Sequence, residues 1–186
     1  IVQPRNTPLG DRNNMLKGNM PTDGGHLCLT PSEVRSLIAS SPGAASYIYK
    51  YIGSGDLIKG EERYCIWVTD EQSHHASKFP EFASRFEKVA EMRAVSSAPT
   101  TRPYAAYPYK FRQIQAVAQD FALVAPRVSS ERRRFLPVGL TTGNSIISDS
   151  AFALYDAPLW NMALIASRIH LIWIATVCGK LKTDFR

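Results

Sequence analysis

The residues best suited to binding chemistry lie in one short basic stretch, Pro126–Arg134, which contains four arginines, two serines and one glutamate. A guanidinium group is a planar donor that can bind a phosphate or the edge of a guanine through two hydrogen bonds. Serine hydroxyls bind phosphates or bases, and a glutamate can accept a hydrogen bond from cytosine. The stretch therefore predicts either a surface that binds a polyanion or a solvated basic turn.

Positive charge is concentrated around this stretch. The 186-residue chain has a formal net charge of +6, and residues 102–134 contain seven basic side chains against two acidic ones. Clustered positive charge is typical of proteins that bind polyanions, although a basic face can also serve solubility alone. The content of 45% hydrophobic and 20% charged residues is that of an ordinary folded domain with a core.

Local patterns predict the elements that must position the basic residues. Thr30–Glu33 has the pattern of a capping box with proline at the first helical position, and the spacing of Phe82 and Phe86 predicts a second helix. Residues 121–125 are typical of a strand, and residues 145–155 of a strand pair or a bulged strand. We expect a mixed α/β domain of the α+β class, with a twisted, largely antiparallel β-sheet and flanking helices.

The C-terminal third predicts one long buried helix, which begins at Asp156 and runs to Cys178 before Gly179. Its apolar residues surround the helix axis, but Arg168 and His170 lie at its middle. A membrane span requires about 20 apolar residues with almost no charge. The pattern therefore indicates a central core helix, and we expect no membrane partner.

Two further segments offer polar side chains for the same surface. Residues 100–115 are rich in basic and aromatic side chains. Alternation in this segment predicts that Phe111 and Ile114 point inward. Lys110, Arg112 and Gln113 are then candidates for contacts with phosphates and bases. The trio at residues 148–150 either orients the arginines, contacts DNA, or forms a local turn with neither role.

Motifs for catalysis are missing from the sequence. The three cysteines are far apart and form no CxxC pair, so we expect free thiols, with Cys65 and Cys178 buried, in a reducing cytoplasmic setting. His74 and His75 are adjacent and lack the spacing of a metal site. No GxGxxG, phosphate loop, HExxH or GxSxG motif occurs. The chain therefore predicts a binding module with no catalytic, cofactor-binding or metal-binding residues of its own.

Five motifs, in the same order, resemble the target recognition domain of MmeI-type restriction–modification proteins. They are Gly18–Gly25, Arg63–Val68, Pro126–Arg132, Ser148–Ser150 and Ala175–Arg186. The resemblance implies that this segment reads duplex DNA beside a methyltransferase domain of the same polypeptide. That domain, outside this sequence, would bind S-adenosylmethionine and methylate adenine at N6 after base flipping. The sequence departs from the family pattern at residues 114–118 and 166–170.

The resemblance also sets the expected boundaries and site. Residues 1–24 are expected to be a linker from the methyltransferase domain, and residues 25–186 the recognition domain. The fragment alone is not expected to be an enzyme, whereas the parent chain is. The expected DNA-binding residues are Arg127, Ser129, Ser130, Glu131, Arg132, Arg133, Lys110, Arg112, Gln113, Ser148 and Asp149.

Two other functions fit the same sequence. The first is a basic protein-interaction or assembly domain that does not read bases directly. The second is an enzyme domain with an unfamiliar site around Asp149, Arg168 and His170, which predicts a deep pocket lined by all three.

Overall fold

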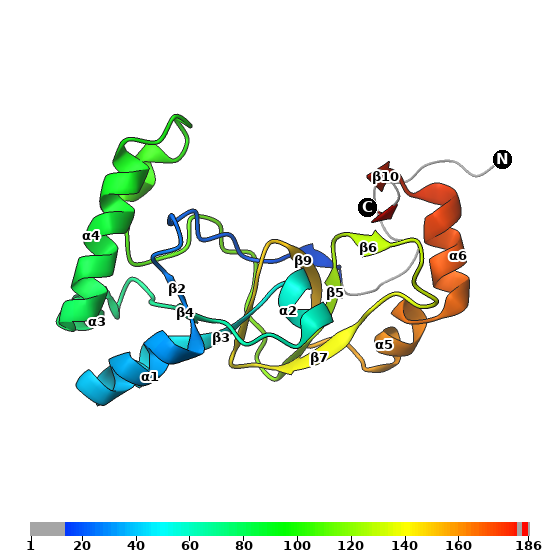
Figure 1. Cartoon of the computed structure of the whole chain (residues 1–186), viewed down its shortest axis with the longest axis horizontal. Helices are drawn as coiled ribbons and strands as arrows, with labels where there is room; N and C mark the ends of the chain where they lie inside the picture. The colour runs from blue at the N-terminus through cyan, green and yellow to red at the C-terminus, as the bar shows by residue number, and fades with distance from the viewer. Residues whose placement is uncertain (1–13, 182–183, 186) are drawn as a thin grey trace.

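The chain forms an elongated molecule with helices at both ends and β-sheets between them (Figure 1). It is a computed structural model, and the residues that it describes are 14–181 and 184–185. Helix α4 (Pro80–Ala94) lies at one end of the long axis, and helix α6 (Arg168–Val177) lies at the other. The predicted α+β class is confirmed, because strands and helices are mixed along the chain.

The first sheet is antiparallel, with the strand order β1-β9-β5-β7. Strand β5, between β9 and β7, is buried on both faces. Ala122 and Val124 pack into a core with Ile147, whereas Leu123 and Ala125 pack into another core beside the C-terminal helices. Alternate residues of a strand point to opposite faces, so a strand covered on both sides is apolar throughout. The strands are β1 (Leu16–Lys17), β5 (Phe121–Pro126), β7 (Gly139–Thr142) and β9 (Ala151–Tyr155).

The second sheet is mixed, with the order β2-β4-β3-β8. Strands β3 and β8 run parallel, and the other two pairings are antiparallel. Residues 145–155 therefore form two strands that belong to different sheets, and the turn at residues 148–150 joins them. The expected single sheet is two four-stranded sheets. The strands of the second are β2 (Cys28–Leu29), β3 (Ile48–Ile52), β4 (Tyr64–Ile66) and β8 (Ser145–Ile147).

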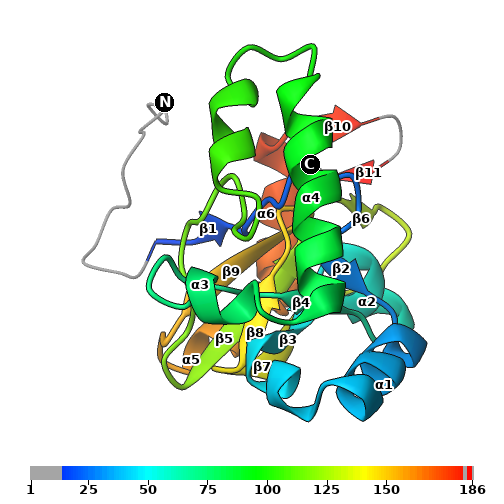
Figure 2. The same ribbon diagram turned by 90° about the vertical axis from the view of Figure 1, so that its left-hand side faces the viewer.

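Helices α1 (Pro31–Ser40) and α4 lie in front of the sheets when the molecule is viewed from the α4 end (Figure 2). The predicted capping box is confirmed, because the Glu33 amide donates to the Thr30 hydroxyl and the Thr30 amide donates to the Glu33 carboxylate. Phe82 and Phe86 of α4 are buried against the second sheet, as their spacing predicts. The shorter helices are η1 (Pro42–Tyr47), α2 (Ser54–Lys59), α3 (Ser73–Ala76) and η2 (Arg102–Ala106).

The prediction of one long buried C-terminal helix is wrong. The segment forms two helices, α5 (Trp160–Ile165) and α6, which are separated at Ala166 and Ser167. Ser167 has an extended backbone, and its hydroxyl accepts a hydrogen bond from the His170 amide at 3.1 Å. Serine in this position is an N-cap, which begins a new helix instead of continuing the old one. Only Leu171 of α6 is buried, so the helix covers the first sheet from outside.

A third, small sheet brings the C-terminal tail beside the basic stretch. Strand β11 (Asp184–Phe185) pairs antiparallel with both β10 (Lys180–Leu181) and β6 (Ser129–Ser130). The backbone of Asp184 lies opposite that of Ser130. This pairing fixes the start of the loop that contains the arginines.

The expected linker falls partly on the described residues. Residues 1–13 lie outside them, whereas residues 14–24 contain β1 and the fully buried Asn19. The Asn19 side chain donates to the main-chain oxygens of Ala116 and Ile147, and so ties this segment to strand β8 and to the loop before β5. Among the helices in the described residues, none has the length and apolar character required to cross a membrane.

Candidate nucleic-acid interface

Arg127 directly follows β5, and hydrogen bonds to neighbouring segments fix its backbone and its side chain. Its amide donates to the main-chain oxygen of Ser150 and to the hydroxyl of Ser54, both at 3.3 Å. Its guanidinium donates to the main-chain oxygen of Asp149 at 3.0 Å and lies 5.9 Å from the centre of the Phe152 ring. The half-buried Arg127 side chain therefore has a defined direction before any ligand binds.

The trio at residues 148–150 orients this arginine. It forms the turn between β8 and β9, in which the hydroxyls of Ser148 and Ser150 lie 3.2 Å apart. Ser54 at the start of α2 donates to the Ser150 main-chain oxygen. The Asp149 carboxylate pairs with Lys17 at 3.5 Å, and the Asp149 main-chain oxygen accepts from the Arg127 guanidinium. Of the three alternatives for the trio, orientation of an arginine has direct structural support.

Strand β6 leads into an exposed loop, residues 131–135, which is called the arginine loop below. Ser129 is buried, and its hydroxyl has no hydrogen-bond partner among the residues described. Ser130 is the more accessible serine: its hydroxyl accepts from the Arg132 amide at 3.3 Å, and its main-chain oxygen accepts from the Arg133 amide at 3.2 Å. These bonds close a tight turn, and residues 131–135 are all exposed.

The guanidinium groups of Arg132, Arg133 and Arg134 are exposed on this loop. Within the part of the chain that the structure describes, none of the three has an ion pair or a side-chain hydrogen bond. Unpaired cations on an exposed loop can bind an external anion without first breaking an internal contact.

Lys110, Arg112 and Gln113 lie apart from this loop. Lys110 forms an ion pair with Asp70 at 2.8 Å, and its ammonium lies 4.9 Å from the centre of the Tyr107 ring. Arg112 donates to the Thr100 hydroxyl at 3.0 Å. The main chain of Gln113 pairs with Met20, and its side chain is exposed. These residues follow η2, near the α4 end, whereas β6 and α6 lie near the other end (Figure 1).

Ile114 is not inward as expected, because its side chain is 50% exposed. Phe111 is buried as predicted. Residues 114–118 form no strand, and a two-residue alternation has meaning only where the backbone is a regular strand. This part of the prediction is therefore wrong.

Arg93 has a structural role that the sequence pattern did not predict. It lies on the inner face of α4, is fully buried, and uses all five of its N–H donors. The acceptors are the main-chain oxygens of Pro21, Thr22, Tyr104, Tyr107 and Lys110, at 2.8–3.1 Å. Burial lowers the pKa of Arg93, but a guanidinium remains charged at neutral pH. The available signal was a charged residue in the helical stripe after Phe82, Phe86 and Val89.

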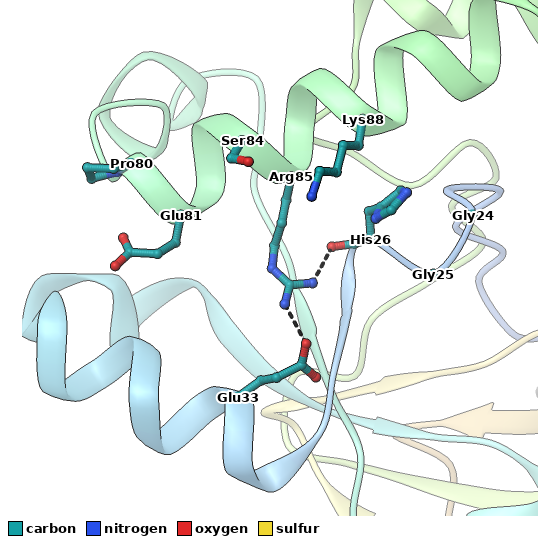
Figure 3. A pocket seen from close by; sticks show the side chains of 9 residues that line it. All are labelled: Gly24, Gly25, His26, Glu33, Pro80, Glu81, Ser84, Arg85 and Lys88. Carbon is teal, nitrogen blue, oxygen red and sulfur yellow. Dashed lines mark hydrogen bonds and ion pairs between the residues drawn. The ribbon is translucent and has the colours of Figure 1, made fainter.

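A hollow of about 660 Å³ lies between α1, α4 and the turn that contains Gly24 and Gly25 (Figure 3). Arg85 points into it and donates to the Glu33 carboxylate at 2.6 Å and to the main-chain oxygen of His26 at 2.9 Å. Lys88 and Glu81 also line the hollow. Its two cations are balanced by two carboxylates, so it is not built to attract an anion.

Comparison with known proteins identifies the family of this chain. The family described as "MmeI, target recognition domain" matches residues 1–186. The chain belongs to this family of target recognition domains. DNA methyltransferase A of Bacillus subtilis (strain 168) is 34% identical over 186 residues, which are 100% of this chain and 21% of that protein.

The MmeI-family fold is also seen in a solved structure. The Type IIL restriction–modification enzyme MmeI in complex with DNA matches with a TM-score of 0.90 and 31% identity, over 98% of this chain and 24% of that chain. The MmeI-type recognition domain described here therefore spans only a small part of both relatives' length.

The cysteines of this MmeI-family domain are free thiols. Burial raises the pKa of the Cys28 thiol to about 11, and burial also raises that of Cys65. Such thiols are protonated at neutral pH and are poor nucleophiles. The expectation that Cys178 is buried is wrong, because the backbone turns from helical to extended at this residue and leaves it exposed.

The residues of the alternative enzyme site do not converge in the MmeI-type fold. The Nδ1 atom of His170 lies 2.9 Å from the Ile165 main-chain oxygen, and this histidine lines an apolar hollow with Ser129. Arg168 lines a different hollow, and Asp149 pairs with Lys17. No group of three or more histidine, cysteine or carboxylate side chains in the described residues is arranged to hold a metal ion.

Proposed function

We propose that this domain recognises a specific sequence in duplex DNA. The single observation behind the proposal is the exposed loop of Arg132, Arg133 and Arg134, whose guanidinium groups have no internal partner among the described residues. Its family membership and the DNA complex of its MmeI relative support the same function. Such a substrate implies that the protein acts in the cytoplasm.

The residues of the proposed DNA face have different roles. Arg132 and Arg133 are free to contact phosphates or guanine edges, and Glu131 lies beside them. The loop follows Ser129 and Ser130 of β6. Arg127 is held by the turn that contains Ser148 and Asp149. Lys110 and Arg112 are held by internal contacts, whereas the exposed amide of Gln113 is available to adenine.

We further propose that the domain works beside a methyltransferase domain of one polypeptide, which binds S-adenosylmethionine and methylates adenine at N6. Support comes from the name and greater length of the B. subtilis relative. The outer face of α6 also supports a protein neighbour, because Ile169, Trp173 and Val177 are 81%, 57% and 54% exposed. Contiguous exposed apolar side chains are typical of interfaces.

DNA binding as a function of salt tests the proposed function. Each phosphate that the protein neutralises releases condensed counterions, and contributes about 0.9 to the slope of log affinity against log salt. We expect the Arg132→Ala/Arg133→Ala double variant to flatten the slope by about 2, measured by fluorescence anisotropy with a labelled duplex.

The matched control is Arg35→Ala/Lys78→Ala, which removes the same charge from exposed positions on and near α1 and α3. It should retain the slope of the unaltered protein. Equal slopes for all three proteins, or no binding at low salt, would refute the proposed DNA face.

A further inference from the structure

A second basic element lies against the arginine loop. Arg133 and Arg134 of the loop and Arg168 at the start of α6 line one hollow of about 310 Å³, together with Glu131. Arg168 is more than thirty residues from the loop in sequence, and the break of the C-terminal helix at Ser167 makes it the first residue of α6. The fold therefore adds a cation to the loop that its sequence neighbours do not supply.

The charges in this hollow are not balanced. Three guanidinium groups face one carboxylate, and the first turn of α6 contains no acidic residue. Arg133, Arg134 and Arg168 have no ion pair or side-chain hydrogen bond within the described ranges. Like charges brought together with fewer counter-charges repel one another, and a bound anion would reduce the repulsion.

The apolar lining of the hollow strengthens its attraction for an anion. Leu171 and Ile172 of α6 also line the hollow; Leu171 is buried, and Ile172 is 58% exposed. Apolar atoms displace water, so a charge beside them interacts more strongly than it would in bulk solvent. Guanidinium groups from two elements can then bind separate oxygens of one tetrahedral anion.

We propose that Arg133, Arg134 and Arg168 form a binding site for a backbone phosphate of the DNA. This inference rests on the proposed function and deepens it, since it assigns α6 to the DNA contact. Phosphate oxygens are the same at every base step, so this site positions the duplex and carries no sequence information. Base readout then belongs to other residues of the face.

The test is salt-dependent binding of the whole chain to two duplexes of equal length and unrelated sequence, between about 50 and 200 mM salt. Arg168→Ala should reduce the slope by about 1 and Arg134→Ala/Arg168→Ala by about 2, equally for both duplexes. Arg168→Lys should restore most of the slope, because an ammonium also pairs with phosphate. Arg35→Ala, an exposed arginine on α1, is the matched control.

Three results would overturn the inference, and circular dichroism would first verify that each variant is folded. An Arg168→Ala slope equal to that of Arg35→Ala would show that α6 does not touch the backbone. Unequal losses on the two duplexes would show that Arg168 reads bases. Both results leave the proposed function intact if Arg132→Ala/Arg133→Ala still flattens the slope, whereas no DNA binding by the unaltered protein would refute both.

Discussion

Two charged hollows at opposite ends of the molecule both contain arginine and glutamate, but in different arrangements. In the hollow between α1 and α4, Arg85 is paired with Glu33, and carboxylates equal cations in number (Figure 3). In the hollow beside α6, three arginines face one glutamate. A cation with an internal partner stabilises the fold, whereas a cation without one is available to a ligand.

This contrast explains why a count of basic residues along the chain does not locate a binding surface: the count does not distinguish paired cations from unpaired ones. Lys110 and Arg112 belong to the same basic region of the sequence as Arg132, yet both have internal contacts. The α4 end should therefore respond to mutation in stability, and the α6 end in DNA affinity. Substitutions at the two ends can test this division, and the largest effect is expected at Arg93.

Arg93→Met should destabilise the domain by about 3–5 kcal/mol, because it leaves five main-chain oxygens around a buried side chain without their donors. Urea unfolding measures the change. Arg134→Met, at the other end, should change the free energy of unfolding by less than about 0.5 kcal/mol. A similar loss of stability in both variants would contradict the division.

Asp56→Asn should cost roughly 2 kcal/mol. The buried Asp56 carboxylate accepts from Nε and Nη2 of Arg63, at 2.7 and 2.5 Å, and from the Gly53 amide at 2.7 Å. An amide can accept only part of this set. Thermal and urea unfolding would be compared with those of Glu61→Gln, whose ion pair with Lys59 is exposed and should be nearly neutral.

Stability at acid pH should depend on Glu33. The Thr30 amide and hydroxyl, followed by Arg85, lower the pKa of Glu33 to about 2. A carboxyl whose pKa is lower in the folded state stabilises the protein above its unfolded value near 4.5, and this contribution is lost as the pH falls from there to about 2. The side chain is 43% exposed, so solvent screening keeps the effect small.

Glu33→Gln should therefore show a shallower fall in unfolding free energy than the unaltered protein between pH 4.5 and 2. Urea unfolding at several pH values measures this slope, with Glu87→Gln on the exposed face of α4 as the control. Identical slopes for Glu33→Gln and the unaltered protein would count against the hydrogen bonds from Thr30 and Arg85 as the cause of the lowered pKa.

The smallest effect is expected for Lys88→Ala. Lys88 lines the charge-balanced hollow, so its removal should leave the salt slope of DNA binding unchanged, whereas Arg134→Ala should lower the slope by about 1. Anisotropy titrations of both variants measure the difference. A slope that falls equally in the two would place DNA at the α4 end as well.

Local signals predicted the parts of the fold that local interactions determine. The capping box at Thr30 and the stripe of Phe82 and Phe86 are confirmed, and each pattern lies within a short stretch of sequence that forms one helix. The division of the strands between two sheets depends on contacts far apart in sequence, which no local pattern contains. Ser167 did carry a local cap signal, but the apolar residues on both sides of it favoured one continuous helix.

For the candidate site, the sequence identified the loop, but not which of its charged side chains have partners within the protein. Arg132 and Arg127 are equivalent as residue types, and only the turn at residues 148–150 distinguishes the held side chain from the free one. Arg168 lies in the same hollow as Arg133 and Arg134 only because α6 packs beside the loop. Pairing and convergence are tertiary properties, so residue types and spacing alone could not supply them.

Arg93 has a consequence for how the sequence of the α4 end can change. Its five contacts are all with main-chain oxygens, which every amino acid possesses. The segments at residues 21–22 and 104–110 are therefore held in shape by bonds that do not depend on their own side chains. New outward residues can be tried there, by evolution or by design, while the backbone that presents them stays in place.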